Sequence, residues 1–169
     1  METVDVLFAR HRNGIFRYLY RMVGEADAAS DLTQEVFLRL SRSAVPDTGP
    51  SGLRAWVFTV ARHLALNHLR DTSRRPEATE LVEQPRPAIQ EIAAALREAI
   101  DNLPVVERDV FMMREAGGLS YDEISRVCNL PPGAVRSRLH RARQQLRETL
   151  GGSLRALRPA RGVSLAHRK

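Results

Sequence analysis

Arginine side chains gather in one segment near the end of the chain. Five arginines stand between Gly133 and Glu148, and Glu148 is the only acid among them. Apolar residues recur there at helical spacing and predict one buried stripe: Val135, Leu139, Ala142 and Leu146. Across the helix lie Arg136, His140, Arg143, Gln144 and Arg147, flanked by Ser137 and Arg141. Because arginine and glutamine read base edges and arginine also binds phosphate, the pattern predicts a helix that enters the major groove of DNA.

The residues just before this helix predict a helix-turn-helix. Ser120 and Glu123 have the spacing of a capping box, which would start a short helix over 121–128. Asn129 is a residue type that tolerates the left-handed conformation at a helix end, and Pro131 follows before the next helix begins. A capped short helix, a tight turn and a longer helix are the layout of this DNA-binding motif.

Helical periodicity also recurs upstream, whereas strand signals are scarce. We expect a first helix to end at Gly24, a second to start with Asp27 as its N-cap, and a long third helix to follow the loop 41–52. The apolar stripe of the third helix consists of Leu53, Trp56, Val57, Val60 and Leu64, with Trp56 in the core. Over 71–90 the periodicity fails, because prolines interrupt a polar, acidic stretch.

We therefore expect an all-α fold of two small helical domains joined by a flexible linker. Residues 1–75 would form a helical bundle, 76–90 the linker and 91–150 the helix-turn-helix domain. The apolar positions of the second domain before its helix-turn-helix are Ile92, Leu96, Ile100, Leu103, Val106, Val110, Phe111 and Met113. The last helix should end at Gly151 and Gly152, which leaves 151–169 as a basic disordered tail.

The composition narrows the class of protein. The chain has 169 residues, a net charge of +6 and one cysteine, and every base except Lys169 is arginine. The charge favours an anionic partner, and no apolar run approaches the ~20 residues of a membrane span. The single cysteine fits a reducing cytoplasm, and Cys128 is expected to be a small core residue. The histidines have no zinc-site spacing and no catalytic motif occurs, so we predict no metal, cofactor or catalytic residue.

The stretch 103–150 resembles the promoter-reading C-terminal domain of extracytoplasmic-function (ECF) sigma factors of the sigma-70 family. It keeps most of that pattern: Leu103, Pro104, Arg108, Ser120, Glu123, Ile124, Gly133, Val135, Ser137, Arg138, Leu139, Arg141, Ala142 and Leu146. Two positions depart, since Ala134 replaces a threonine whose hydroxyl could touch phosphate and Ser125 replaces an alanine. The resemblance implies that the −35 promoter element is contacted by Arg136, Ser137, Arg138, His140, Arg141, Arg143 and Arg147.

The segment DLTQEVFLRL, residues 31–40, resembles the part of a sigma factor that binds the clamp helices of the largest polymerase subunit. The implied polymerase contacts are Asp31, Gln34, Glu35 and Arg39. Physically, this is an amphipathic helix whose polar outer row could pair with a polar coiled coil. The segment also distinguishes the chain from response-regulator output domains of the LuxR type, which share a similar C-terminal pattern.

Residues 53–75 resemble the sigma segment that captures the melted −10 element. Promoter opening without ATP requires that single strand binds better than duplex, with a base held out of the stack and cations along the backbone. The implied −10 contacts are Arg54, Arg62, His63, Asn67, Arg70 and Arg74, with a flipped base near the loop 43–52. Because His63 stands where asparagine is common and Asn67 where aspartate is common, we expect the same architecture with an altered −10 preference or altered local capping.

The two blocks occur in the family's order, which implies an ECF sigma factor and no enzyme. The implied partners are core RNA polymerase, through its clamp helices and flap, promoter DNA as duplex and as melted single strand, and an anti-sigma factor. Three alternatives stay open on the sequence: a helix-turn-helix regulator that acts without polymerase docking, a nucleic-acid hydrolase, and a decoy that binds an anti-sigma factor without starting transcription.

Overall fold

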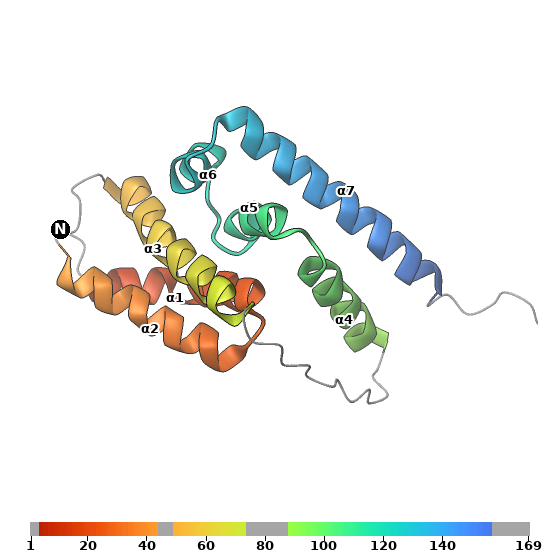
Figure 1. The fold of residues 1–169 in the computed structure, drawn as a ribbon, viewed down its shortest axis with the longest axis horizontal. Helices are drawn as coiled ribbons and strands as arrows, with labels where there is room; N and C mark the ends of the chain where they lie inside the picture. Colours follow the sequence, from red (N-terminus) through yellow and green to blue (C-terminus); the bar gives the residue numbers. More distant parts are fainter. Residues whose placement is uncertain (1–3, 44–48, 74–87, 157–169) are drawn as a thin grey trace, which may run out of the picture.

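The computed structural model describes residues 4–43, 49–73 and 88–156, which form α-helices with short connections (Figure 1). The helices are α1 (Val4–Val23), α2 (Ala26–Arg42), α3 (Gly49–Thr72), α4 (Ala88–Asp101), α5 (Val105–Glu115), α6 (Tyr121–Cys128) and α7 (Pro132–Ala156). The described part of the chain has no strand, and the expected all-α class is confirmed.

Helices α1–α3 pack pairwise against one another and form what we call the N-terminal module. Their shared core is apolar, with Leu19 of α1, Leu40 of α2 and Val57 of α3 all buried. Trp56 is partly buried against this core, as expected. The long α3 therefore has one side fixed by packing, while its other positions are available for polar contacts.

Helices α4–α7 form the C-terminal module, in which α5 and α6 pack together and α7 packs on α4, α5 and α6. Val110, Ile124 and Leu139 are buried in its centre. Cys128 is buried beside Met113, with the two sulfur atoms 3.9 Å apart, so its predicted place in the core is confirmed.

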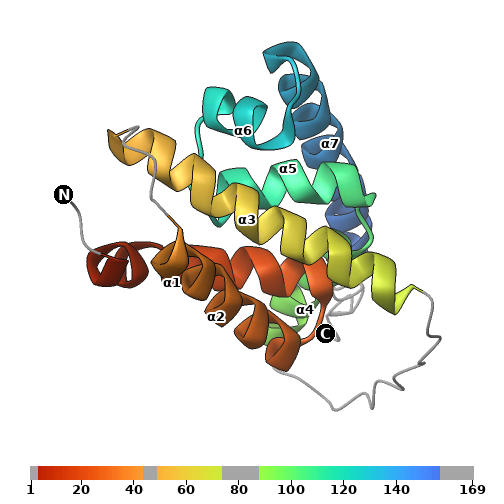
Figure 2. The ribbon, with the colours of Figure 1, turned by 60° about the vertical axis from the view of Figure 1, so that its left-hand side comes forward.

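The two modules pack against each other, which the expectation of a flexible tether did not include. Helix α3 lies along α6, and α1 contacts α5 and α4 (Figure 2). Buried side chains of both modules form one continuous cluster. Of the predicted linker 76–90, residues 76–87 lie outside the described residues, and Ala88 already begins α4.

Some predicted helix ends agree with the structure and others differ from it. Gly24, with φ of 84°, ends α1 as expected. The predicted N-cap of α2 at Asp27 is wrong, because Glu25 is the N-cap and the helix begins at Ala26. Asp27 lies in the first turn, where its negative charge interacts favourably with the helix dipole. Helix α7 continues through Gly151 and Gly152, because an interior glycine costs only about 0.5–1 kcal/mol and does not by itself end a helix.

The apolar pattern before the helix-turn-helix was only partly right. Val106 is 46% exposed, and Ile92 and Leu96 are exposed as well. Helix α5 instead turns the carboxylates of Glu107 and Asp109 inward, where both are buried. Buried carboxylates require partners, and these partners define much of the site described next. The predicted tail is helical up to Ala156, and 157–169 lie outside the described residues.

Candidate nucleic-acid and polymerase interfaces

The helix-turn-helix is built as the sequence predicts. The Ser120 backbone N–H donates to Glu123 Oε2 at 2.7 Å, and the Glu123 N–H donates to Ser120 Oγ at 3.2 Å, which completes the capping box of α6. Asn129 ends α6 in the left-handed region, with φ of 51°. This turn sets the direction in which α7 leaves the motif.

Helix α7 has the two faces that the arginine pattern predicts. Its inner stripe is buried: Val135, Leu139, Ala142 and Leu146. The outer candidates Arg136, Ser137, His140, Arg141 and Arg147 are exposed, while Arg138 and Arg143 are half-buried. The structure thus places these seven residues on one helix of the C-terminal module, with most of them facing solvent.

Two of the α7 arginines are held by acids of α5. Arg141 Nε donates to Glu107 Oε1 at 3.1 Å, and Arg143 Nη2 donates to Glu115 Oε1 at 3.4 Å. The pKa of Arg143 is raised, first by a hydrogen bond with the Tyr121 hydroxyl and then by Glu115, against an opposing effect of burial. These contacts fix the direction of both guanidinium groups before any DNA is bound.

The six −10 candidates do not form one cluster. Arg54 and Arg62 are half-buried and point toward the C-terminal module, where both find carboxylates. His63, Asn67 and Arg70 are exposed, and Arg70 Nη2 donates to Asn67 Oδ1 at 2.6 Å. Arg74 and residues 44–48 of the preceding loop lie outside the described residues.

The four polymerase candidates lie on the outer side of α2. Asp31, Gln34 and Arg39 are exposed, and Glu35 is half-buried and pairs with Arg39 at 2.7 Å. The inner side of α2 buries Ala29, Thr33, Val36, Phe37 and Leu40. Gln34 also lines a groove between α1 and α2 together with Phe8 and Phe16. An exposed polar row over a buried apolar side is the arrangement that a helix-docking surface needs.

Sequence reasoning missed a polar contact between the modules that centres on Asp109. The Asp109 carboxylate is 1% exposed and accepts hydrogen bonds from the Tyr18 hydroxyl and from Arg62 Nε, both at 2.7 Å. Burial raises the pKa of Tyr18, and the negative charge of Asp109 raises it further. Burial alone would lower the pKa of Arg62, but Asp109 outweighs it and the net shift is upward. The available signal was an acid inside the apolar run of α5.

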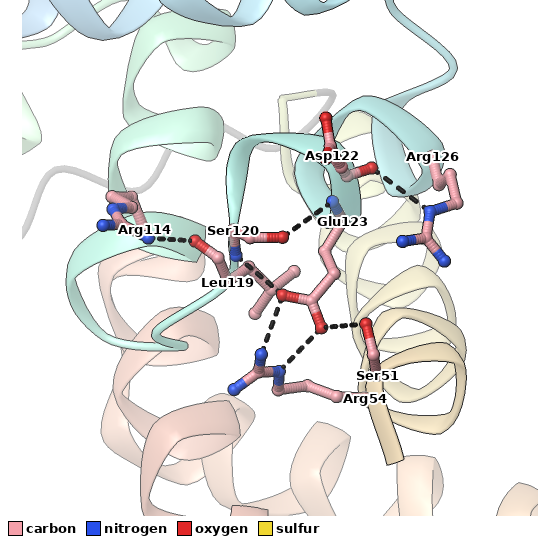
Figure 3. A network of polar contacts seen from close by, with 8 residues as sticks. All are labelled: Ser51, Arg54, Arg114, Leu119, Ser120, Asp122, Glu123 and Arg126. Atoms are coloured by element: carbon pink, nitrogen blue, oxygen red, sulfur yellow. Dashed lines mark hydrogen bonds and ion pairs between the residues drawn. The ribbon is translucent and has the colours of Figure 1, made fainter. Parts of the chain in front are cut away.

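A second missed contact centres on Glu123 (Figure 3). Its carboxylate accepts hydrogen bonds from Arg54 Nε at 3.0 Å and Arg54 Nη2 at 2.8 Å, and from Ser51 Oγ at 3.0 Å. Arg54 and Ser51 belong to α3, whereas Glu123 begins α6. The residue that the sequence marks as a helix cap is therefore also the partner of a candidate DNA-binding arginine.

Two further features do not occur among the described residues. These residues contain no group of three or more histidine, cysteine, aspartate or glutamate side chains placed to hold a metal ion. Among the same residues, no helix combines the length and apolarity needed to cross a membrane.

Comparison with known proteins assigns both modules. Residues 7–75 match the model of sigma-70 region 2, and residues 93–146 match that of sigma-70 region 4. These matches define a protein of the sigma-70 class, with region 2 in the N-terminal module and region 4 in the C-terminal module. Sequence relatives narrow the class further, and the chain belongs to the ECF family of RNA polymerase sigma factors.

Two relatives illustrate the match. The chain is 35% identical over 161 residues to the ECF RNA polymerase sigma factor SigE of Mycolicibacterium smegmatis, covering 89% of this chain and 62% of that relative. It is 31% identical over 169 residues to the RNA polymerase sigma-H factor of Pseudomonas aeruginosa, covering 89% of this chain and 88% of that protein.

Solved structures share the fold. The sigma factor RpoE in complex with the anti-sigma factor NepR from Bartonella quintana is 21% identical, with a TM-score of 0.69 over 87% of this chain and 96% of that one. CnrH in complex with the cytosolic domain of CnrY is 25% identical, with a TM-score of 0.64 over 88% of each chain.

Proposed function

We propose that this chain directs core RNA polymerase to promoters through their −10 and −35 elements and assists promoter opening. The observation that carries the proposal is the presence of regions 2 and 4, in order, in one chain whose α7 has an exposed basic face above a buried stripe. Residues 1–75 and 91–150 are the functional domains in this proposal, with 76–90 joining them.

Polymerase docking is assigned to the outer row of α2. Asp31, Gln34, Glu35 and Arg39 offer both charges and an amide on an exposed surface, which suits a polar coiled coil such as the clamp helices. The second polymerase contact in this proposal joins the C-terminal module to the flap. Because the reaction takes place on the bacterial polymerase, the chain would act in the cytoplasm.

Reading of the −35 element is assigned to α7. The exposed Arg136, His140 and Arg147 can enter a major groove, because the opposite stripe anchors the helix to the rest of the module. Arg141 and Arg143, already oriented by acids of α5, suit contacts of fixed direction to bases or phosphates. Arg138 and Ser137 complete this set.

Capture of the −10 element is assigned to α3. Melted DNA is held by cations along its backbone and by a base turned out of the stack, and no catalytic residue is needed for this step. Arg54, Arg62 and Arg70 supply cations along one helix, with His63 and Asn67 beside them. Binding energy for the single strand shifts the promoter from closed to open.

The proposed regulator is an anti-sigma factor. Two solved proteins that share this fold, RpoE and CnrH, were each captured with a partner protein, NepR and the cytosolic domain of CnrY. A partner of that kind would hide the α2 and α7 surfaces from polymerase and promoter.

The test is reconstituted transcription. Purified chain and core RNA polymerase are mixed on the DNA upstream of this gene, because self-activation is common in the family, and runoff products are measured. We expect a product of defined length that requires the chain, and co-elution of chain and core enzyme in gel filtration. Binding to duplex DNA with no association to core enzyme would overturn the proposal in favour of a regulator that acts without polymerase.

A further inference from the structure

Helix α6 passes into α7 through a short turn (Figure 1), and two hydrogen bonds between Ser125 and Leu130 span it. The Leu130 N–H donates to the Ser125 carbonyl at 2.9 Å, and the Ser125 hydroxyl donates to the Leu130 carbonyl. The first bond is the one that a Schellman motif forms around a left-handed residue, which here is Asn129. The second bond is an addition to that motif, because it needs a hydroxyl at residue 125.

The Ser125 hydroxyl does not bond to its own helix. A serine or threonine inside a helix commonly donates to the carbonyl four residues earlier, and the hydroxyls of Thr59 and Ser137 do so in this chain. Ser125 instead reaches across the turn to Leu130. The two residues that follow Leu130 are prolines, which have no N–H to donate. The Ser125 hydroxyl therefore supplies a donor in a turn whose backbone offers few.

We propose that Ser125 is a positioning residue for reading of the −35 element. Its hydrogen bond to Leu130 fixes the direction in which α7 leaves the turn before DNA is bound. This inference rests on the proposed function, because it takes α7 to be the helix that reads the −35 element. Ser125 acts through the backbone of the turn and contacts no base.

The buried stripe of α7 holds the helix on its module but does not set its rotation alone. Hydrophobic attraction depends on buried area and has no direction, whereas a hydrogen bond weakens steeply as its angle changes. Arg136 and His140 lie in the first three turns of α7, directly after the tied segment, and both are exposed. A small rotation of α7 at the turn therefore moves both side chains relative to the base edges that they would contact.

A helix fixed in advance gains affinity for the specific element only. If an untied turn allows orientations in which α7 does not fit the groove, the apparent affinity falls in proportion to the fraction of molecules that still fit. Loss of one hydrogen bond allows that fraction to change by about two- to tenfold. Non-specific attraction to phosphates depends on the charge of the chain, which a change from serine to alanine leaves the same.

Three variants separate positioning from stability. Ser125→Ala removes the hydroxyl and should leave α6 intact, because alanine favours helices more than serine does. Ser125→Thr keeps a hydroxyl at the same place and is the rescue variant. The matched control is Thr59→Val in α3, which removes a half-buried hydroxyl that donates to the carbonyl of Ala55 at 2.8 Å, outside region 4.

The experiment compares two forms of the runoff promoter, one with its −35 element intact and one with that element scrambled. Core polymerase assembled with each variant is titrated with both forms at one salt concentration. Hydrogen exchange of the Leu130 amide, followed by NMR on the free chain, reports the turn, and urea unfolding reports stability.

We expect Ser125→Ala to bind the intact promoter about two- to tenfold more weakly than wild type and the scrambled promoter equally well. Exchange of the Leu130 amide should be faster in this variant. Ser125→Thr and Thr59→Val should match wild type in each measurement of promoter binding.

Three results would overturn the inference while the proposed function stands. One is an equal loss of affinity for both promoter forms in Ser125→Ala, which is the result of a merely structural role. The others are unchanged or tighter binding of the intact promoter by Ser125→Ala, and failure of Ser125→Thr to restore binding. If instead wild type does not bind core polymerase, or binds both promoter forms equally, the proposed function fails, and this inference fails with it.

Discussion

The Arg54 guanidinium donates two hydrogen bonds to the carboxylate of Glu123, which simultaneously closes the capping box of α6. One side chain therefore starts a helix of region 4 and fixes that region against α3 of region 2. The geometry is bidentate, and Glu123 is 1% exposed, whereas the Arg54 side chain is 32% exposed. The two functions of Glu123 can be separated, because glutamine also serves at this position of a capping box.

Replacing Glu123 with glutamine should loosen the interface and spare α6. We expect Glu123→Gln to lower the free energy of unfolding by about 1.5–3 kcal/mol, since hydrogen bonds to charged groups contribute about that much. Helix content by circular dichroism should stay at the wild-type level, and urea unfolding gives the stability. The control is Asp122→Asn, an exposed acid in the same turn of α6. Equal losses for the two variants would contradict the assignment of Glu123 to the interface.

The same pair predicts how stability depends on pH. Burial alone would raise the pKa of Glu123, but hydrogen bonds from the Ser120 backbone, Arg54 and Ser51 outweigh it and lower the pKa below its usual value of 4.5. A carboxyl with a lowered pKa in the folded state contributes stability above its unfolded pKa and loses it as pH falls through the folded value.

We therefore expect wild type to exceed Glu123→Gln in stability by a constant margin between about pH 5.5 and 7. The margin should shrink steadily once the pH falls below 4.5. Urea unfolding of both proteins over this range measures it, with Asp122→Asn as the reference for general acid effects. A margin that grows on acidification would contradict the lowered pKa.

The sequence was sufficient for several features that depend on local chemistry, although it misplaced the start of α2 and the end of α7. The capping box at Ser120, the left-handed Asn129 and the buried stripe of α7 follow from residue type and spacing within one or two turns. The contact between Asp109 and Arg62 joins residues 47 positions apart, and periodicity carries no information on such pairs. An acid among apolar residues of α5 marks a buried charge, but its partner depends on how the modules pack.

The candidate site was predicted unevenly for the same reason. Residue types located the basic face of α7 and the polar row of α2, because each lies on a single amphipathic helix. They did not reveal that Arg54 and Arg62 turn toward region 4 while His63 and Arg70 stay exposed. The close approach at Gly14 likewise has no signature in the sequence, because an added Cβ there would lie 2.9 Å from the backbone oxygen of Ala116 in the other module.

Gln34 tests the assignment of α2 to polymerase binding. Because Gln34 is exposed, Gln34→Ala should change the free energy of unfolding by no more than about 0.5 kcal/mol. We expect it nevertheless to weaken binding to core polymerase. Affinity is measured by fluorescence titration of labelled chain with core enzyme. Ser41→Ala, an exposed change on the same helix, is the control. If Gln34→Ala bound core polymerase with wild-type affinity, Gln34 would not belong to the surface of α2 that binds polymerase.

Arg136 and Arg143 test the assignment of α7 to the −35 element. If each contacts a base edge, Arg136→Ala or Arg143→Ala should cost about 1–3 kcal/mol in binding and relax the preference at one position. Competition between −35 duplexes of different sequence, at one fixed salt concentration, measures both effects. Arg17→Ala, an exposed arginine of α1, controls for loss of positive charge. Unchanged promoter selection with both arginines replaced would refute the reading of this helix.

Cys128 should be almost inert in the folded protein. Burial, with a smaller contribution from the charge of Asp109, raises the pKa of its thiol to about 12. Compared with the usual value of 9.0, this alone lowers the thiolate fraction at neutral pH about a thousandfold, and only the thiolate reacts with disulfide reagents. Labelling by a coloured disulfide at about pH 8 should therefore be slow in wild type and fast after urea unfolding. The variant Ser41→Cys combined with Cys128→Ser supplies the reaction rate of an exposed thiol. If native Cys128 reacted at that rate, the thiol would be accessible in the folded protein, which would contradict its burial between α5 and α6 beside Met113.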